Sequence, residues 1–104
     1  MNSFITPNEI YVLLNKVLNS LVRRKFGKQF SIRLNSLQFI SNRTNMNYFQ
    51  TSSERFTLKS VKSVSIDELI IIKEFILFNI NSALLCIDSK NYKEVKDVEI
   101  VIKI

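Results

Sequence analysis

Positive charge is the most informative chemical feature of this sequence, and most of it lies in residues 23–62. This stretch holds nine of the fifteen Lys and Arg residues and a single acid, Glu54, whereas the rest of the chain has six basic and eight acidic residues. The net charge of +6 therefore comes entirely from it. Six of the Tyr and Phe residues also lie there. A positive surface interleaved with aromatic rings suits a polyanion with flat bases, which is a nucleic acid.

We expect contacts to a nucleic acid to come from the cations of this stretch and from the polar and aromatic side chains beside them. The cluster 23–25 falls in the last turn of an expected helix, where cations also compensate the helix dipole. A phosphate contact and a structural role are both open for it. The expected contact residues are Arg23, Arg24, Lys25, Lys28, Arg33, Arg43, Asn45, Asn47, Tyr48, Arg55, Lys59 and Lys62.

The composition argues against an enzyme. The chain has no histidine, one cysteine and one glycine. The usual general base is therefore absent, a transition-metal site has too few ligands, and a Gly-rich phosphate loop is excluded. We expect a binding protein without metal or cofactor. Cys86 lies in the apolar run LLCI, and we expect it to be buried in the core.

The first long element is predicted to be a helix from Pro7 to about Phe26. Thr6, Pro7 and Glu9 supply a cap, a first helical residue and the acid of a capping box. Apolar residues then recur at helical spacing as far as Leu21. Gly27, the only glycine, is a natural residue to end the helix.

The middle of the chain alternates with a period of two. Residues 30–34 predict a half-buried strand, with an irregularity at Asn35-Ser36. Residues 54–64 predict a second long strand, antiparallel to the first. The polar segment 42–53 between them is expected to form an extended loop or a hairpin arm. Residues 1–5 are expected to form a brief edge strand or a frayed terminus.

A second capping box, Ser65–Glu68, predicts a helix from Ile66 to about Ile80 that is apolar nearly all round. Residues 83–87 are either a short strand or a continuation of this helix, and residues 98–104 alternate as a final strand. A helix apolar on all sides is expected to pack on the sheet and also against a protein neighbour or a second copy. The expected interface residues are Leu69, Ile72, Phe75 and Ile76.

These elements predict one α+β domain over residues 1–104, with the ferredoxin-like order βαββαβ and two helices on an antiparallel-rich sheet. The longest apolar run, residues 69–80, is too short to span a bilayer, and residues 1–22 lack a secretory pattern. We therefore expect an intracellular protein of the cytoplasm or an organellar matrix, without a membrane partner. Scarce Gly, Ala and Pro beside abundant Ile, Asn and Lys predict an AT-rich genome.

Two segments resemble ribosomal protein S ten of the small subunit. Residues 52–62, SSERFTLKSVK, are similar to that family's S-R-E-Q-F-E-x-R-T-H-K, and the ending at residues 97–104 is similar to its terminal V-D-V-E-I-K-L. Val61 departs from the family's His, and the Pro-His dipeptide before the return of the arm is absent. The resemblance implies an arm that contacts ribosomal RNA and an apolar second helix that faces a protein neighbour.

Three functions are consistent with the sequence. The first is an RNA-binding structural component of a ribosomal small subunit, cytoplasmic or organellar. The second is a small DNA-binding accessory protein of a plasmid or phage, which places a basic β-arm in a groove and dimerises through residues 69–80. The third is a protein-interaction subunit or inhibitor whose basicity is incidental. The resemblance to ribosomal protein S ten favours RNA over DNA as the partner.

Overall fold

Two helices and a three-stranded sheet make up most of the computed structural model. The structure describes residues 7–36, 40–41, 46–47, 53–87, 89–90, 92 and 94–104. The predicted first strand, residues 1–5, lies outside the described residues. The elements are α1 (Pro7–Phe26), β1 (Phe30–Ser36), β2 (Ile40–Ser41), β3 (Met46–Asn47), β4 (Ser53–Ser60), α2 (Ile66–Ile87) and β5 (Asp97–Lys103).

The first helix has the predicted bounds, and Gly27 ends it. This glycine has a φ of 123°, a conformation that side chains rarely adopt. Its N–H donates to the carbonyl of Arg23 at 3.1 Å, and its own carbonyl accepts from Phe30 N at 3.3 Å. The chain therefore turns at once from α1 into β1.

The sheet has the strand order β1-β4-β5. Strands β1 and β4 are antiparallel, as predicted, with Phe30 opposite Ser60. The register shifts between Leu34 and Ser36, where the sequence predicted an irregularity. Strand β5 runs parallel to β4 because α2 carries the chain back along the sheet before β5 begins. The sheet is therefore mixed, with one parallel and one antiparallel pairing, rather than antiparallel-rich.

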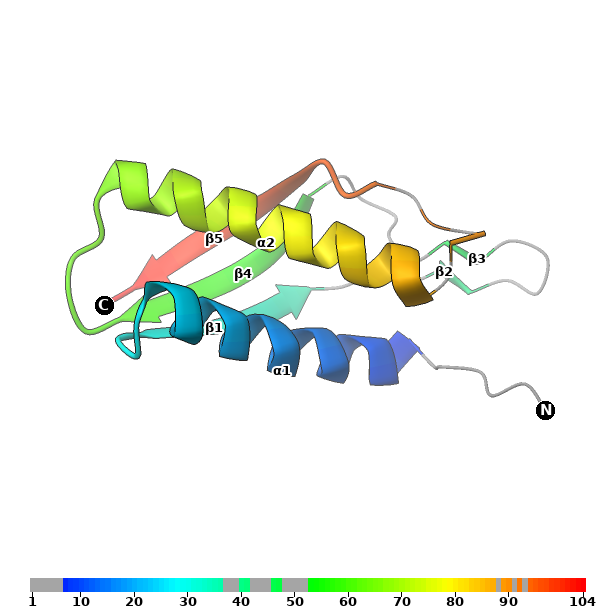
Figure 1. Ribbon diagram of the computed structural model, residues 1–104, viewed down its shortest axis with the longest axis horizontal. Helices are drawn as coiled ribbons and strands as arrows, with labels where there is room; N and C mark the ends of the chain where they lie inside the picture. The colour runs from blue at the N-terminus through cyan, green and yellow to red at the C-terminus, as the bar shows by residue number, and fades with distance from the viewer. Residues whose placement is uncertain are drawn as a thin grey trace.

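A short hairpin lies beyond the end of the sheet (Figure 1). Strands β2 and β3 pair antiparallel, with Ile40 opposite Asn47. The sequence predicted an arm between the two long strands, and this pairing confirms a hairpin there that begins earlier than expected. The rest of the predicted arm, residues 42–45 and 48–52, lies outside the described residues.

Residues 83–87 continue the second helix, which is one of the two alternatives that the sequence left open, so α2 extends beyond Ile80. Its N-terminus is capped as expected: Ser65 Oγ accepts from Glu68 N at 3.2 Å. Every fourth residue from Ile72 to Leu84 is buried, so one stripe faces the core. Cys86 lies about 200° around the helix from Leu84 and is exposed. The prediction of a buried cysteine was wrong because the run LLCI is helical.

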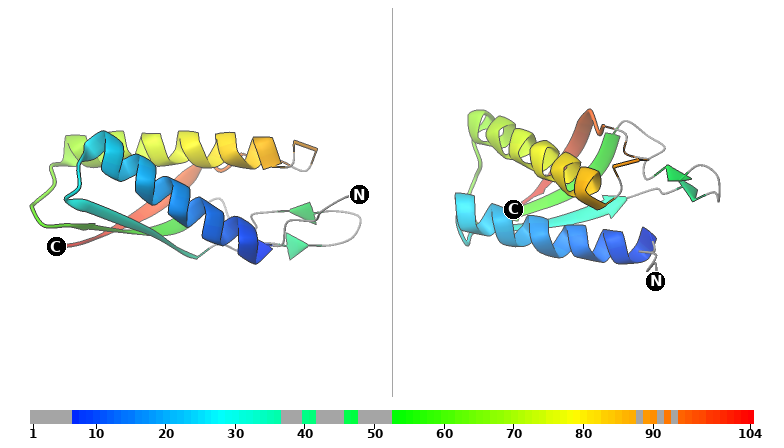
Figure 2. Two further views of the ribbon diagram at one scale, coloured as in Figure 1. Left: turned by 60° about the horizontal axis from the view of Figure 1, so that its bottom comes forward. Right: turned by 45° about the vertical axis from the view of Figure 1, so that its right-hand side comes forward.

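Both helices cover the same face of the sheet, and no described helix or strand covers the other, which we call the open face (Figures 1 and 2). Buried side chains from α1, α2 and one face of the strands form a single core. Phe30 and Phe56, its largest buried side chains, are 1% and 0% exposed. The Cα radius of gyration is 14.2 Å, close to about 13 Å for a compact domain of this length.

Side chains of α1 cap the outer edge of β1. Asn19 Oδ1 accepts from Ile32 N at 2.9 Å, and Asn15 Oδ1 accepts from Leu34 N at 2.5 Å. The Tyr11 hydroxyl donates to the carbonyl of Leu34 at 2.5 Å. Backbone groups that would otherwise face outward unpaired are therefore satisfied by the neighbouring helix.

Candidate nucleic-acid interface

The open face of the sheet brings cations from three strands together. The strand register places Ser31, Lys59 and Lys103 side by side in one row across the sheet. In the next row, Arg33 lies opposite Thr57. Because side chains alternate along a strand, all five point away from the buried face that the helices cover.

A hollow of about 250 Å³ lies on this face. Hydroxyl, amide and cationic groups surround it, and no carboxylate lines it. The Asn35 side-chain amide donates to the Thr57 hydroxyl across the two strands. Such donors and cations suit an anion such as a phosphate. The lining residues are Ser31, Arg33, Asn35, Thr57, Lys59 and Lys103.

Lys59 and Lys103 stand directly opposite each other on β4 and β5. Like charges in directly opposing positions destabilise a sheet. Both side chains are exposed, so solvent screens part of their repulsion. A bound anion would offset the remainder, and this gives the row a physical reason to attract one.

Arg55 is exposed, as the sequence predicted, but its charge is compensated. Its Nε lies 2.5 Å from Glu99 Oε1, and the two side chains are 63% and 53% exposed. We therefore expect Arg55 to contribute less to anion binding than Arg33 or Lys59.

Five further predicted cations gather at one end of the molecule. Gly27 leads from α1 into β1, and Phe30 at the start of β1 pairs with Ser60 at the end of β4. The last turn of α1, the turn after it and the segment after β4 therefore meet there. All five cations are exposed: Arg23, Arg24, Lys25, Lys28 and Lys62.

One of these cations also has a structural contact. Lys25 Nζ lies 5.6 Å from the centre of the Phe75 ring and 5.9 Å from that of Phe26. The two rings meet edge to face with their centroids 5.4 Å apart. A cation over such rings stabilises their packing, so Lys25 joins α1 to α2 whatever else it contacts.

The rest of the predicted set is not placed. Arg43, Asn45 and Tyr48 lie outside the described residues, and for Asn47 only the backbone in β3 is described. Conversely, the sequence prediction missed Lys103. Its alternation with the apolar residues of the final strand placed it on the polar face, but the pairing of β5 with β4 was not predicted.

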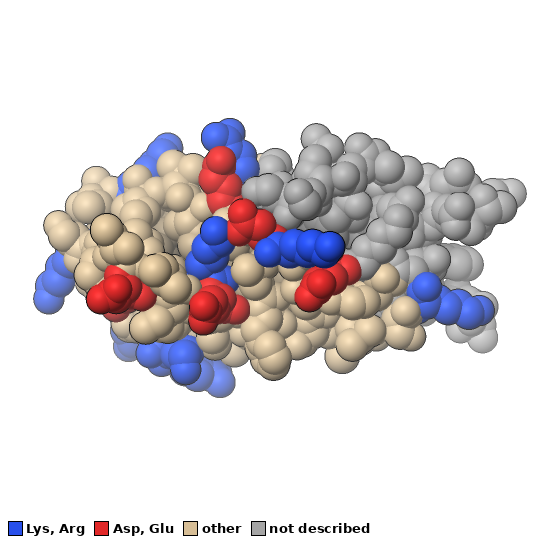
Figure 3. All heavy atoms as spheres, turned by 90° about the horizontal axis from the view of Figure 1, so that it is seen from above, with Lys and Arg blue, Asp and Glu red and all other residues tan. Residues whose placement is uncertain are grey.

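The side of the molecule formed by α2 and β5 carries charges of both signs. Figure 3 looks onto it and shows acidic and basic side chains side by side. Lys73 Nζ lies 2.6 Å from Asp97 Oδ1, and this hydrogen bond lowers the pKa of Asp97. The unbalanced positive charge is therefore concentrated on the open sheet face and the end where α1 terminates.

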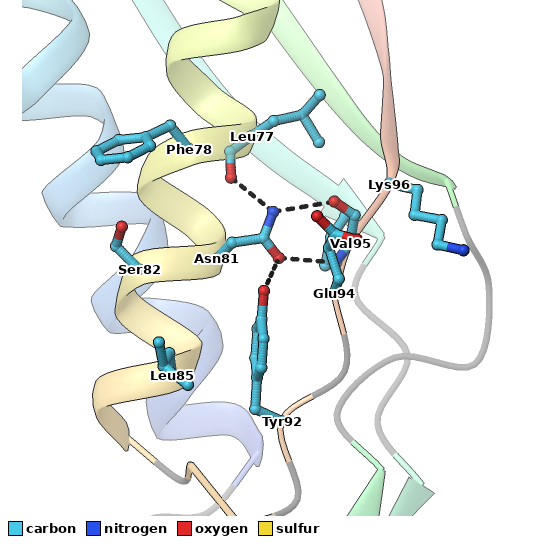
Figure 4. A pocket seen from close by; sticks show the side chains of 9 residues that line it. All are labelled: Leu77, Phe78, Asn81, Ser82, Leu85, Tyr92, Glu94, Val95 and Lys96. Atoms are coloured by element: carbon cyan, nitrogen blue, oxygen red, sulfur yellow. Dashed lines mark hydrogen bonds between the residues drawn. The ribbon is translucent and has the colours of Figure 1, made fainter.

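A second hollow, of about 450 Å³, lies between α2 and the segment before β5 (Figure 4). The Asn81 amide occupies its centre. Its Nδ2 donates to the carbonyls of Leu77 and Val95, both at 2.9 Å. Its Oδ1 accepts from Tyr92 Oη at 2.9 Å and Val95 N at 2.7 Å. The amide has no hydrogen-bonding capacity left for a ligand, so it serves to hold this segment on α2.

The predicted partner interface on α2 is mostly internal. Ile72 and Ile76 are fully buried in the chain's own core, while Leu69 and Phe75 are half-buried against it. The prediction misplaced this surface because the helix is apolar nearly all round. The stripe that faces the core could therefore not be distinguished from the exposed apolar residues. The exposed apolar residues of α2 are Ile66, Ile70, Ile71, Phe78 and Leu85.

By length and composition alone, α2 is long and apolar enough to cross a membrane. The length argument against a membrane span, which rested on residues 69–80, therefore does not hold for the full helix. The core helices of soluble proteins can have the same length and apolar composition, and one stripe of α2 packs on the sheet and α1. Among the described residues, no group of three or more His, Cys, Asp and Glu is arranged to hold a metal ion.

Comparison with known proteins identifies a similar fold. No family model and no curated protein matches the chain. A crystal structure of a protein from Lactobacillus casei ATCC 334, provisionally described as a redox protein, superposes with a TM-score of 0.55 at 17% identity. The match covers 99% of this chain and 72% of the other. At this identity, the likeness extends to the fold alone.

Proposed function

We propose that this protein binds the phosphate backbone of a nucleic acid through the open face of its sheet. The observation that carries the proposal is the hollow on that face, where Arg33, Lys59 and Lys103 meet hydroxyl and amide donors and no carboxylate. The exposed cations at the end of α1 are proposed as a second group of phosphate contacts. No enzymatic activity or cofactor is part of the proposal.

Phosphate contacts, rather than base reading, are the expected source of affinity. The hollow on the open face is lined by cations, hydroxyls and an amide, and none of its lining residues has an aromatic ring on which a base would stack. Binding of this kind depends strongly on salt and weakly on sequence. Any stacking would have to come from Tyr48 or its neighbours in the arm.

RNA is the favoured polymer, and a ribosomal small subunit is the favoured setting. Both rest on the resemblance of residues 52–62 and 97–104 to ribosomal protein S ten. The full βαββαβ order belongs to the same proposal and requires a strand from residues 1–5. The alternatives are the small DNA-binding accessory protein of a plasmid or phage and the protein-interaction subunit.

Fluorescence anisotropy with labelled single-stranded RNA, hairpin RNA and duplex DNA tests the proposal over a range of salt concentrations. We expect Arg33→Glu and Lys59→Glu each to weaken binding and to reduce the slope of log K against log salt by about one. Lys90→Glu is the matched control, because it makes the same charge change on an exposed residue beyond the end of α2. Circular dichroism checks that each variant folds.

Two results would overturn the proposed surface. The first is an affinity and salt slope unchanged by Arg33→Glu and Lys59→Glu. The second is an equal loss for Lys90→Glu, which would mean that net charge alone governs binding. Tighter binding of duplex DNA than of either RNA would transfer the proposal to the DNA-binding alternative. Failure to bind any of the polymers would leave the protein-interaction alternative.

A further inference from the structure

The two outer edges of the sheet differ in how their backbone groups are satisfied. On β1, three side chains of α1 cap the backbone of Ile32 and Leu34. On β5, the other outer strand, no hydrogen bond from a helix side chain to the backbone is found among the described residues. The Asp97 carboxylate bonds locally to the backbone of Val98, and β4 is the single strand neighbour of β5 among the described residues. An uncapped strand edge is a template for pairing with another strand.

A groove of about 360 Å³ runs along this edge of β5. Residues 97–100 and Ile102 line one side of it. Because consecutive residues of a strand point to opposite faces, a groove that touches all of them follows the edge of β5. The other side is the N-terminal part of α2, where Ile66 and Ile70 are 76% and 51% exposed. The groove therefore offers backbone groups beside apolar side chains.

The sequence of β5 is self-complementary when a second copy runs antiparallel to it. If a two-fold axis passes at Val101, Glu99 lies opposite the second copy's Lys103, and Lys103 lies opposite the second copy's Glu99. On the helix side of the sheet, Ile100 lies opposite the second copy's Ile102. Opposite charges and apolar pairs in directly opposing positions stabilise an antiparallel pair.

The direction of the carboxylates favours this register over the neighbouring one, which would set Asp97 against Lys103. Asp97 Oδ1 is bound to Lys73 Nζ at 2.6 Å, so its carboxylate is directed toward α2. Glu99 is bound to Arg55 and so remains on the open face, the face that carries Lys103. Lys103 lies beside Lys59 on the open face, and the second copy's Glu99 would offset that like-charge contact. The pairing therefore engages Lys103, so in the dimer the proposed phosphate contacts of the open face fall to Arg33 and Lys59.

We propose that the chain forms a two-fold dimer through antiparallel pairing of β5 with β5 of a second copy, centred on Val101. The two three-stranded sheets then form one continuous sheet, with all helices on the same face. The dimer does not depend on nucleic-acid binding, since it rests on the edge, the groove and the charges of β5.

Cysteine trapping tests the register. In a Cys86→Ser background, Val101→Cys places two thiols on opposing residues, whose Cα atoms are about 4.5–5.5 Å apart in an antiparallel sheet. A disulfide spans about 4.4–6.8 Å between Cα atoms. We expect Val101→Cys to form a disulfide-linked dimer on mild oxidation. Ile100→Cys, which the neighbouring register would place on the axis, is expected to remain unlinked.

Charge reversal tests the pairing without cysteines. Glu99→Lys and Lys103→Glu each bring like charges together twice in a dimer, and we expect each to raise the dimer Kd by about tenfold. An equimolar mixture of the two variants restores both opposite-charge pairs. We expect it to form a heterodimer with about the wild-type affinity, measured by analytical ultracentrifugation with one variant labelled. The rescue also shows that both variants are folded.

Three outcomes would overturn the proposal. One is a wild-type chain that stays monomeric at hundreds of micromolar. The edge of β5 would then pair with a strand other than β5, or its own charges would prevent pairing. Another is a dimer that Val101→Cys does not link. The third is a dimer that both charge reversals leave unchanged, which would place the contact elsewhere. Linking through Ile100→Cys alone would reject the register centred on Val101.

Discussion

Asn81 and Val95 hold each other through two hydrogen bonds that use both atoms of the amide. Nδ2 donates to the Val95 carbonyl at 2.9 Å, and Val95 N donates to Oδ1 at 2.7 Å. The amide thus takes the place of a neighbouring backbone for a segment that belongs to no helix or strand. Val95 is 3% exposed, so its backbone groups have little access to water as an alternative.

Asn81→Ala is expected to lower the free energy of unfolding by about 1–3 kcal/mol, because it leaves buried groups of Val95 unpaired. Asn79→Ala is the matched control. Asn79 lies two residues earlier in α2 and donates only to the carbonyl of Phe75, at 2.8 Å. Urea unfolding followed by circular dichroism measures both. Equal stability of the two variants would show that the hydrogen bonds between Asn81 and Val95 contribute no stability of their own.

Asn19 should protect the edge of β1. Asn19→Ala removes the acceptor of Ile32 N and is expected to lower stability by about 1 kcal/mol and to increase aggregation on heating. Asn19→Asp keeps an acceptor oxygen and has a similar helix propensity, so it should behave like the wild type. Thermal unfolding with light scattering compares the three proteins. An alanine variant that is as stable and as soluble as the aspartate variant would contradict the capping role.

The pair Lys73–Asp97 should make stability depend on pH in the acid range. The hydrogen bond from Lys73 is the main cause of the lowered pKa of Asp97. A lowered pKa in the folded state contributes stability above the unfolded pKa of about 3.9, and this contribution is lost as pH falls through the folded value. Both side chains are partly exposed, so the effect is expected to be about 1 kcal/mol or less.

A double-mutant cycle of Lys73→Met and Asp97→Asn measures this contribution. We expect a coupling energy at pH 7 that fades as the pH is lowered below about 4. A coupling that persists undiminished at pH 2.5 would show that packing, rather than the charge on Asp97, joins the two residues.

Local signals in the sequence were enough to predict most elements. Three local signals are the helix start at Pro7, the single glycine at position 27 and the two-residue period of residues 30–34. The structure confirms the elements that they predict. The strand that pairs with β5 could not be predicted from the sequence, because the adjacency of strands depends on how α2 crosses the sheet. Lys103 was missed for this reason, although its place on the polar face was evident.

The second helix shows the other limit of the sequence. Periodicity locates a buried stripe only where polar residues mark the opposite side, and α2 is apolar on several sides. Ile72 was therefore assigned to a partner interface although it is fully buried in the chain's own core. The buried position predicted for Cys86, which is exposed, has the same origin.

Substitution of two adjacent residues of α2 separates the core stripe from the exposed one. Ile72 is 0% and Ile71 52% exposed. Ile72→Asp buries an unpaired carboxylate and is expected to unfold the chain or destabilise it by about 4 kcal/mol or more. Ile71→Asp adds the same charge at a surface position and is expected to change stability by no more than about 0.5 kcal/mol. Urea unfolding and heteronuclear NMR spectra of both variants measure the difference. If Ile71→Asp unfolds the isolated chain as fully as Ile72→Asp, the Ile71 side chain is buried in solution, and this would contradict the exposed position that the fold gives it.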